Sequence, residues 1–146
     1  MKSGKFWLAV LVGGVVANII DGLVWDGLVW NLWLGPSYVM QNTTLFRQDT
    51  AVAWYIIGDF VATFVFVWVY DKVAGAFGTT VQDGAKAGLY LGILMSFPTF
   101  IFMSLMFNGF SYGLSWIMTI YSIIWYVILG TVVAAVMKKG AATAAA

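Results

Sequence analysis

Four apolar stretches, each long enough to cross the hydrocarbon core of a bilayer, dominate this sequence of 146 residues. Crossing the core takes about 20 apolar residues in a helix. The four predicted spans cover residues 6–30, 51–70, 85–107 and 112–137. Only 9% of the residues are charged, whereas a soluble domain has roughly a quarter. We therefore expect an all-α, multi-pass membrane protein. One compact four-helix domain should span residues 1–139, with an Ala-rich tail at 140–146.

The basic residues gather on one side of the predicted spans. Arg47 lies in the first connection, and the third connection has no basic residue. The six lysines lie near the N-terminus, around the second connection or near the C-terminus: Lys2, Lys5, Lys72, Lys86, Lys138 and Lys139. Cytoplasmic segments of membrane proteins carry an excess of Lys and Arg. The distribution therefore predicts that both termini are cytoplasmic. We expect the protein in the inner (plasma) membrane.

Several side chains that carry out catalysis or bind metals are missing from the sequence. There is no Cys and no His, and all six acidic residues are Asp. Thiolate sites need Cys, and His is the commonest metal ligand and the usual general base near neutral pH. We therefore expect neither an enzyme nor a bound metal or cofactor. The net charge of +1 gives no indication of a nucleic-acid partner.

Two acidic residues lie inside the first two predicted spans. With a rise of 1.5 Å per residue, Asp21 lies about 13 Å from the outer end of its span and Asp59 about 12 Å from the outer end of the next. Asn18 precedes Asp21 by one turn on the same side of the helix. An ionised carboxylate exposed to hydrocarbon costs several kcal/mol. The two carboxyl groups should therefore point inward and approach each other, with Asn18 nearby.

Such a pair of acids has two interpretations. Asp21 and Asp59 could form a proton or cation site, either facing a water-filled cavity or holding a cation. They could instead be protonated and hydrogen-bonded as a polar clasp between the first two helices or at an oligomer interface, because polar side chains commonly join membrane helices. A water-filled cavity that reaches both acids would favour transport, and a dry, hydrogen-bonded interface would favour the clasp.

The third predicted span carries small residues at every fourth position, which gives one smooth helix face. Such faces let another helix backbone come close, although substrate passage is an alternative use. The last span offers a shorter version of the same surface. The candidate packing residues are Gly84, Gly88, Gly92 and Ser96 in the third span, and Gly130 and Ala134 in the last.

The four predicted spans follow each other in a recognisable order of parts. The first span ends in aromatic residues, and the second ends in Val67-Trp68-Val69-Tyr70. A Gly-rich entry at residues 83–88 opens the third, and the last closes on Gly130 and Ala134. In this order the chain resembles small, uncharacterised four-helix membrane proteins of bacteria. The tandem Asp-Gly-Leu-Val-Trp repeat that begins at Asp21 departs from that pattern. The resemblance implies the fold but no activity and no site residues.

Together these patterns favour a non-enzymatic membrane protein that acts by packing, as a homo-oligomer or as an accessory subunit of a larger membrane complex. Its expected partners are membrane lipid, further copies of the chain or other membrane subunits. The alternative is a small proton- or cation-coupled transporter or channel that uses Asp21 and Asp59. A third hypothesis is a lipid- or quinone-binding membrane protein, because the chain is rich in aromatic residues.

The N-terminus also has a second interpretation. Lys2 and Lys5, the apolar run from Phe6 and the small residues up to Ala17 resemble a signal peptide. The apolar stretch continues well past Ala17, which favours an uncleaved first helix.

Overall fold

The structure, a computed structural model, describes residues 4–24, 27, 51–78, 80–107 and 110–137. These residues form four helices: α1 (Gly4–Ile20), α3 (Val52–Phe77), α4 (Val81–Met106) and α5 (Tyr112–Met137). All four are long and apolar enough to cross a membrane, the first over Gly4–Val24. For the described residues, the prediction of an all-helical fold with four helices long and apolar enough to cross a membrane is therefore confirmed.

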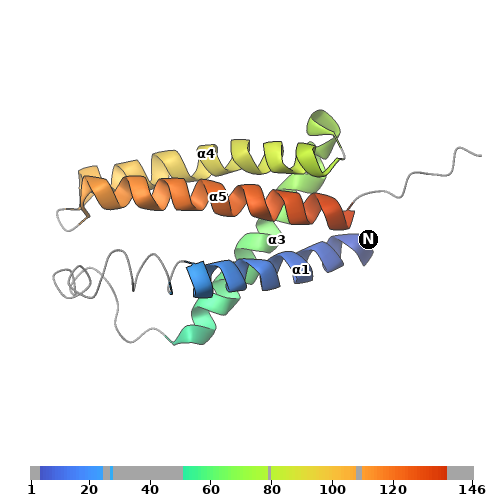
Figure 1. Ribbon diagram of the computed structural model, residues 1–146, viewed down its shortest axis with the longest axis horizontal. Helices are drawn as coiled ribbons and strands as arrows, with labels where there is room; N and C mark the ends of the chain where they lie inside the picture. Colours follow the sequence, from blue (N-terminus) through green and yellow to red (C-terminus); the bar gives the residue numbers. More distant parts are fainter. Residues whose placement is uncertain (1–3, 25–26, 28–50, 79, 108–109, 138–146) are drawn as a thin grey trace, which may run out of the picture.

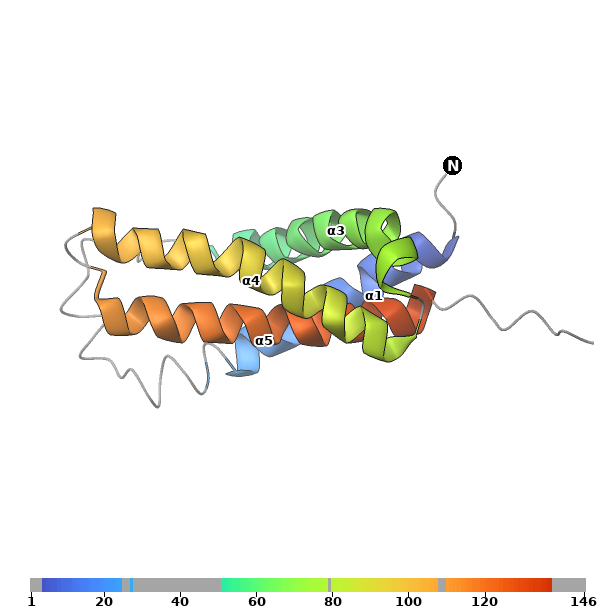
Figure 2. The ribbon, with the colours of Figure 1, turned by 90° about the horizontal axis from the view of Figure 1, so that it is seen from above.

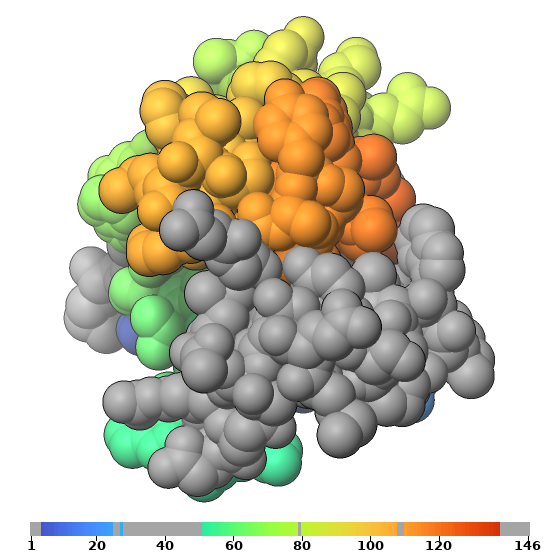
Figure 3. Space-filling view, turned by 90° about the vertical axis from the view of Figure 1, so that its left-hand side faces the viewer, coloured from blue at the N-terminus to red at the C-terminus, as the bar shows by residue number. Residues whose placement is uncertain are grey.

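Successive helices run in opposite directions along the bundle (Figure 1). α4 and α5 lie side by side along their whole length, while α1 contacts α3 and α5. α3 crosses the other helices obliquely (Figure 1), and Figure 2 shows the same helices from above. Figure 3 looks onto the end where α4 ends and α5 begins, and there the start of α3 lies away from those two helices. The core consequently forms where α1, α3 and α5 meet and along the α4–α5 contact.

The second and third helices are longer than predicted. α3 continues to Phe77 rather than ending at residue 70, and α4 begins at Val81 rather than at residue 85. Gly78 follows the last residue of α3, and its φ of 103° lies in the left-handed region that favours glycine. The predicted end of the first span at Trp30 and the tail at 140–146 lie outside the described residues.

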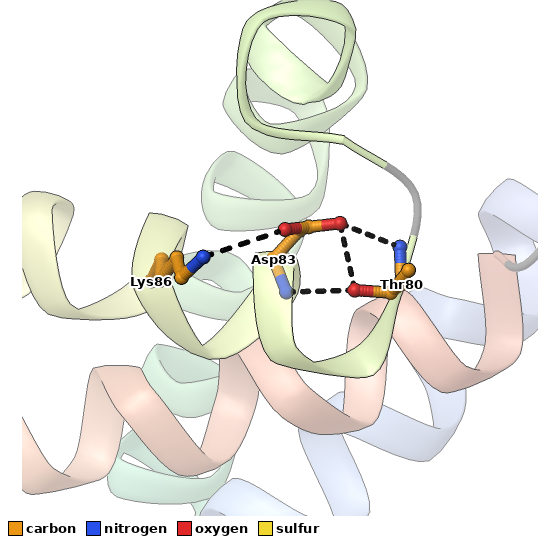
Figure 4. Close-up of polar contacts among 3 residues, drawn as sticks. All are labelled: Thr80, Asp83 and Lys86. Carbon is orange, nitrogen blue, oxygen red and sulfur yellow. Dashed lines mark hydrogen bonds and ion pairs between the residues drawn. The ribbon is translucent and has the colours of Figure 1, made fainter.

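Thr80 and Asp83 explain the early start of α4. The Thr80 hydroxyl accepts a hydrogen bond from the Asp83 N–H at 3.2 Å, and Asp83 Oδ2 accepts one from the Thr80 N–H at 3.0 Å (Figure 4). This reciprocal capping box satisfies two backbone donors that the helix itself cannot pair. Lys86 Nζ lies 3.9 Å from Asp83 Oδ1 on the same exposed turn.

Large apolar side chains face outward on all four helices, while the core is small and closely packed. Trp7, Trp54, Leu94 and Ile120 are each more than half exposed. In a membrane such side chains contact lipid. The apolar outer surface therefore agrees with helices that are long enough to cross the bilayer. The core comprises Phe6, Ala9, Ala17, Phe66, Val67, Tyr70, Ala87, Trp125, Leu129, Val133 and Ala134.

Candidate functional site

Asp21 lies where the first helix changes its hydrogen-bonding pattern. The backbone adopts π-helical geometry over residues 21–24, directly after α1. Wide turns of this kind are frequent at functional sites. Asp21 Oδ1 accepts a 2.5 Å hydrogen bond from the hydroxyl of Tyr121, and both side chains are partly buried. A carboxylate on the first helix is thus joined to the middle of α5.

The other two predicted polar residues are Asn18, on α1, and Asp59, on α3. Asn18 donates from Nδ2 to the carbonyl oxygen of Gly14 at 2.8 Å, so its amide is engaged one turn earlier on its own helix. Asp59 lies on α3 and is partly exposed. The expected approach of the Asp21 and Asp59 carboxyl groups stays a prediction.

Two contacts set the register of α1 against α5. Asp21 meets Tyr121, and a Cβ added to Gly13 would lie 3.1 Å from Leu129 Cδ1. The two helices are antiparallel (Figure 1). The eight-residue step back from Asp21 to Gly13 therefore matches the eight-residue step forward from Tyr121 to Leu129. Ala17 is therefore at the level of Trp125, halfway between these contacts. We call this line of contact, from Asp21 to Gly13 along α1, the α1–α5 seam.

Thr63 of α3 packs against the α1–α5 seam. Thr63 of α3 contributes its side chain at the level of Gly13, where its Cγ2 lies 2.8 Å from the position of an added Cβ. Within the described part of the chain, Thr63 Oγ1, Trp125 Nε1 and Ser115 Oγ have no hydrogen-bond partner. Polar atoms buried in this way usually have a partner or a bound water molecule. At the level of Gly13 the atoms that line the seam are apolar: Thr63 Cγ2, Leu129 Cδ1 and Val133 Cγ2.

The predicted small residues of the third span lie against α5. A Cβ on Gly84 would overlap the Gly130 carbonyl oxygen and Ala134 Cβ, and one on Gly88 would overlap the Tyr126 carbonyl oxygen. At Gly92 the added Cβ would lie 3.0 Å from Tyr126 Cβ. The α4 and α5 backbones can come this close because these positions lack a side chain.

Ser96 extends the same contact with a hydrogen bond. Its hydroxyl donates to the hydroxyl of Ser122 on α5 at 2.7 Å. Ser96 is buried and Ser122 is partly buried, so the bond pairs the two hydroxyls across the helix interface. The small-residue face of α4 is therefore occupied within the chain rather than exposed on its surface.

The residues that the structure describes include no cluster of candidate metal ligands. No group of three or more Asp, Glu, His or Cys side chains gathers there. The expectation that the protein works without a metal or cofactor stays a prediction.

Four residues that take part in these contacts were not predicted from the sequence. Tyr121 and Ser122 are the partners of Asp21 and Ser96, and their position inside an apolar span was the available signal. Gly13 and Gly14 let α1 approach its neighbours, because a Cβ on Gly14 would overlap the ring of Phe60. The Gly-Gly pair in an otherwise apolar helix was the signal for that contact.

Comparisons of this chain with protein-family models, with curated proteins and with solved structures found no match. The resemblance to small bacterial four-helix membrane proteins therefore stays a prediction.

Proposed function

We propose that this chain is a non-enzymatic, multi-pass protein of the inner (plasma) membrane that acts by assembly. It would work as a homo-oligomer or as an accessory subunit of a larger membrane complex. The single observation that carries the proposal is an uncovered stretch of α3. Every residue from 51 to 58 is exposed, although the helix belongs to the bundle.

The uncovered stretch continues into a helix face suited to another helix. We call this face, formed by Trp54, Gly58, Val61, Ala62 and Val65, the exposed α3 face. A Cβ added to Gly58 would meet no heavy atom within 4 Å. Gly58 and Ala62 are one turn apart, and small residues with this spacing let transmembrane helices associate closely. The glycines of α4, by contrast, are already occupied by α5.

The orientation that we propose follows from three described lysines. Lys5 lies at the start of α1, Lys72 near the end of α3 and Lys86 near the start of α4. Because successive helices alternate in direction, these positions share one end of the bundle (Figure 1). The positive-inside rule places that end in the cytoplasm, together with the start of α1 and the end of α5.

Assembly can be tested by measuring particle mass in lipid nanodiscs. We expect particles containing more than one 16.0 kDa chain for the unmodified protein and a lower mass for Gly58→Leu, because the larger side chain separates the helices. The matched control is Gly75→Leu, a position on the same helix that also has open space around it.

The accessory-subunit form of the proposal makes a separate prediction. A chain that is monomeric alone should co-purify with a membrane partner in fixed ratio, and Gly58→Leu should release that partner. Unchanged mass and unchanged co-purification in Gly58→Leu would contradict both forms of the assembly proposal.

A second candidate function is a small proton- or cation-coupled transporter or channel. The observation that favours it is the partly exposed Asp21 carboxylate at a π-turn inside an apolar helix, where ionisable residues usually have a function. Asp21→Asn with Asp59→Asn should then preserve the fold but abolish proton- or cation-dependent flux in proteoliposomes. Equal flux in the variant and the unmodified protein would exclude this candidate.

A further inference from the structure

The exposed α3 face continues along the same side of the helix to a positive charge. Trp68 and Lys72 follow Val65 on this side, and both are exposed. Lys72 comes eighteen residues after Trp54, which is five complete turns of 3.6 residues, so both lie on one line along the helix. Within the described part of the chain, Lys72 takes part in no hydrogen bond or ion pair. The uncovered side of α3 is therefore apolar around Gly58 and cationic at the end that we assign to the cytoplasm.

A helix that packs on the exposed α3 face would also pass beside Lys72. Lys72 is ten residues from Ala62, about 15 Å along the helix. Membrane helices cross at angles of about 20–40°, so a partner that touches Ala62 stays near α3 over that distance. The Lys72 ammonium group stands on a flexible four-carbon stem, which extends its reach. The charge of the partner at this level consequently affects how well it fits.

A second copy of the chain does not match the charge at Lys72. The positive-inside rule gives every copy the same orientation in the membrane. A two-fold pair would place the exposed α3 face of one copy against the same face of the other. The two Lys72 side chains would then lie on the same side of the contact, and like charges brought together disfavour association. A carboxylate at this level is complementary instead.

We propose that the partner of the exposed α3 face is a membrane-spanning helix of a different protein, which carries an Asp or Glu side chain at the level of Lys72. This helix is apolar where it meets Gly58 and Ala62, and acidic about 15 Å further toward the cytoplasm. The proposal rests on the accessory-subunit form of the proposed function and adds the chemistry of the partner.

Disulfide cross-linking to designed probe helices tests the charge of the partner. Each probe is a single membrane-spanning helix of Leu and Ala with one Gly-x-x-x-Ala site and a Cys beside it. Ten residues toward the cytoplasm it carries Glu, Gln or Lys. The probe is expressed together with the full chain bearing Val61→Cys, which has no other Cys. We expect the Glu probe to cross-link up to about fivefold more than the Gln probe, the effect of an exposed ion pair, and the Lys probe to cross-link least.

Charge reversal at Lys72 supplies the matched variant. In the Val61→Cys chain, Lys72→Glu should favour the Lys probe over the Glu probe and leave the yield with the Gln probe unchanged. Equal yields with all three probes would overturn the proposal and mean that Lys72 faces only lipid headgroups or water. A disulfide between two Val61→Cys chains that forms in preference to the Glu probe would overturn it in favour of a second copy.

Gly58→Leu separates this proposal from the assembly proposal on which it rests. The larger side chain should lower cross-linking to every probe, whatever its charge, because it keeps the helices apart. If cross-linking needs Gly58 but ignores the charge of the probe, the acidic partner is wrong and the assembly face stands. If Gly58→Leu leaves all yields unchanged, the exposed α3 face is not an assembly site, and both proposals fail.

Discussion

The hydroxyl of Tyr121 lies 2.5 Å from Asp21 Oδ1, and this hydrogen bond joins residues one hundred positions apart in sequence. It connects the middle of α5 to the π-helical turn that follows α1. Loss of the donor would leave a partly buried carboxylate without its described partner. The bond therefore bears both on the stability of the bundle and on the chemistry of the acid.

Tyr121→Phe should destabilise the bundle by about 1–3 kcal/mol, because it leaves a partly buried acceptor unpaired while keeping the ring. Asp21→Asn, which retains an acceptor oxygen, should be milder. Reversible unfolding in mixed micelles, followed by far-UV circular dichroism, measures the difference. The control is Tyr112→Phe, at an exposed position near the start of the same helix. Equal effects of the two Tyr→Phe changes would show that the Tyr121–Asp21 bond contributes nothing.

Gly88→Ala should cost about 1–3 kcal/mol, the usual scale of overpacking, and Gly88→Leu should cost more. The new Cβ would overlap the Tyr126 carbonyl oxygen, a backbone atom that cannot rotate away. Gly92→Ala should be milder, since its Cβ lies 3.0 Å from a side-chain atom. Gly75→Ala, in open space, serves as the control in the same unfolding experiment. A Gly88→Ala protein as stable as Gly75→Ala would disprove the close contact.

The Ser96–Ser122 hydrogen bond should give a coupling free energy of about 0.6 kcal/mol, with roughly 1.7 kcal/mol as the upper limit for such bonds in membrane proteins. The measurement is a double-mutant cycle of Ser96→Ala and Ser122→Ala, because the single changes also alter packing. Additive effects of the two changes would mean that the 2.7 Å contact does not stabilise the bundle.

The helices could be predicted from the sequence because apolar runs of this length have few alternatives. Their ends could not, since they depend on local geometry. The positive φ of Gly78 and the hydrogen bonds between Thr80 and Asp83 set the α3–α4 connection. A capping signal was nevertheless present, because a Thr three residues before an acidic residue is a common helix start.

The candidate site could be predicted only in part, because a partner in another helix depends on tertiary packing. Asp21 stood out as an acid in an apolar stretch. Which residue of α5 lies opposite Asp21 could not be predicted from the sequence. The depth of each residue in the membrane does, however, indicate Tyr121 as a possible partner. Tyr121 lies two and a half turns after Tyr112, about 14 Å along the helix, close to the depth predicted for Asp21. The packing face of α4, by contrast, could be predicted from its own sequence, because small residues at every fourth position lie on one side of a helix.

Thr80→Ala should shorten α4 at its start and cost about 0.5–2 kcal/mol, the usual range for loss of an N-cap. The Asp83 N–H and the Asp83 carboxylate both lose a bond to the Thr80 side chain. Hydrogen exchange of the first-turn amides in α4 reports the local effect. Thr80→Ser should restore protection, and unchanged exchange in Thr80→Ala would show that the cap is dispensable.

A single cysteine at Ser111 should react with a membrane-impermeant maleimide added from outside the cell, whereas one at Thr80 should not. Both native positions are exposed and they lie at opposite ends of the bundle, at the α4–α5 and α3–α4 connections. The chain has no native Cys, so each variant carries one reactive thiol. Lys72 and Lys86 flank the Thr80 end, and the positive-inside rule places that end in the cytoplasm. Permeabilised cells should label at both positions, which controls for reactivity. External labelling at Thr80 but not at Ser111 would invert the orientation and place the start of α1 and the end of α5 outside.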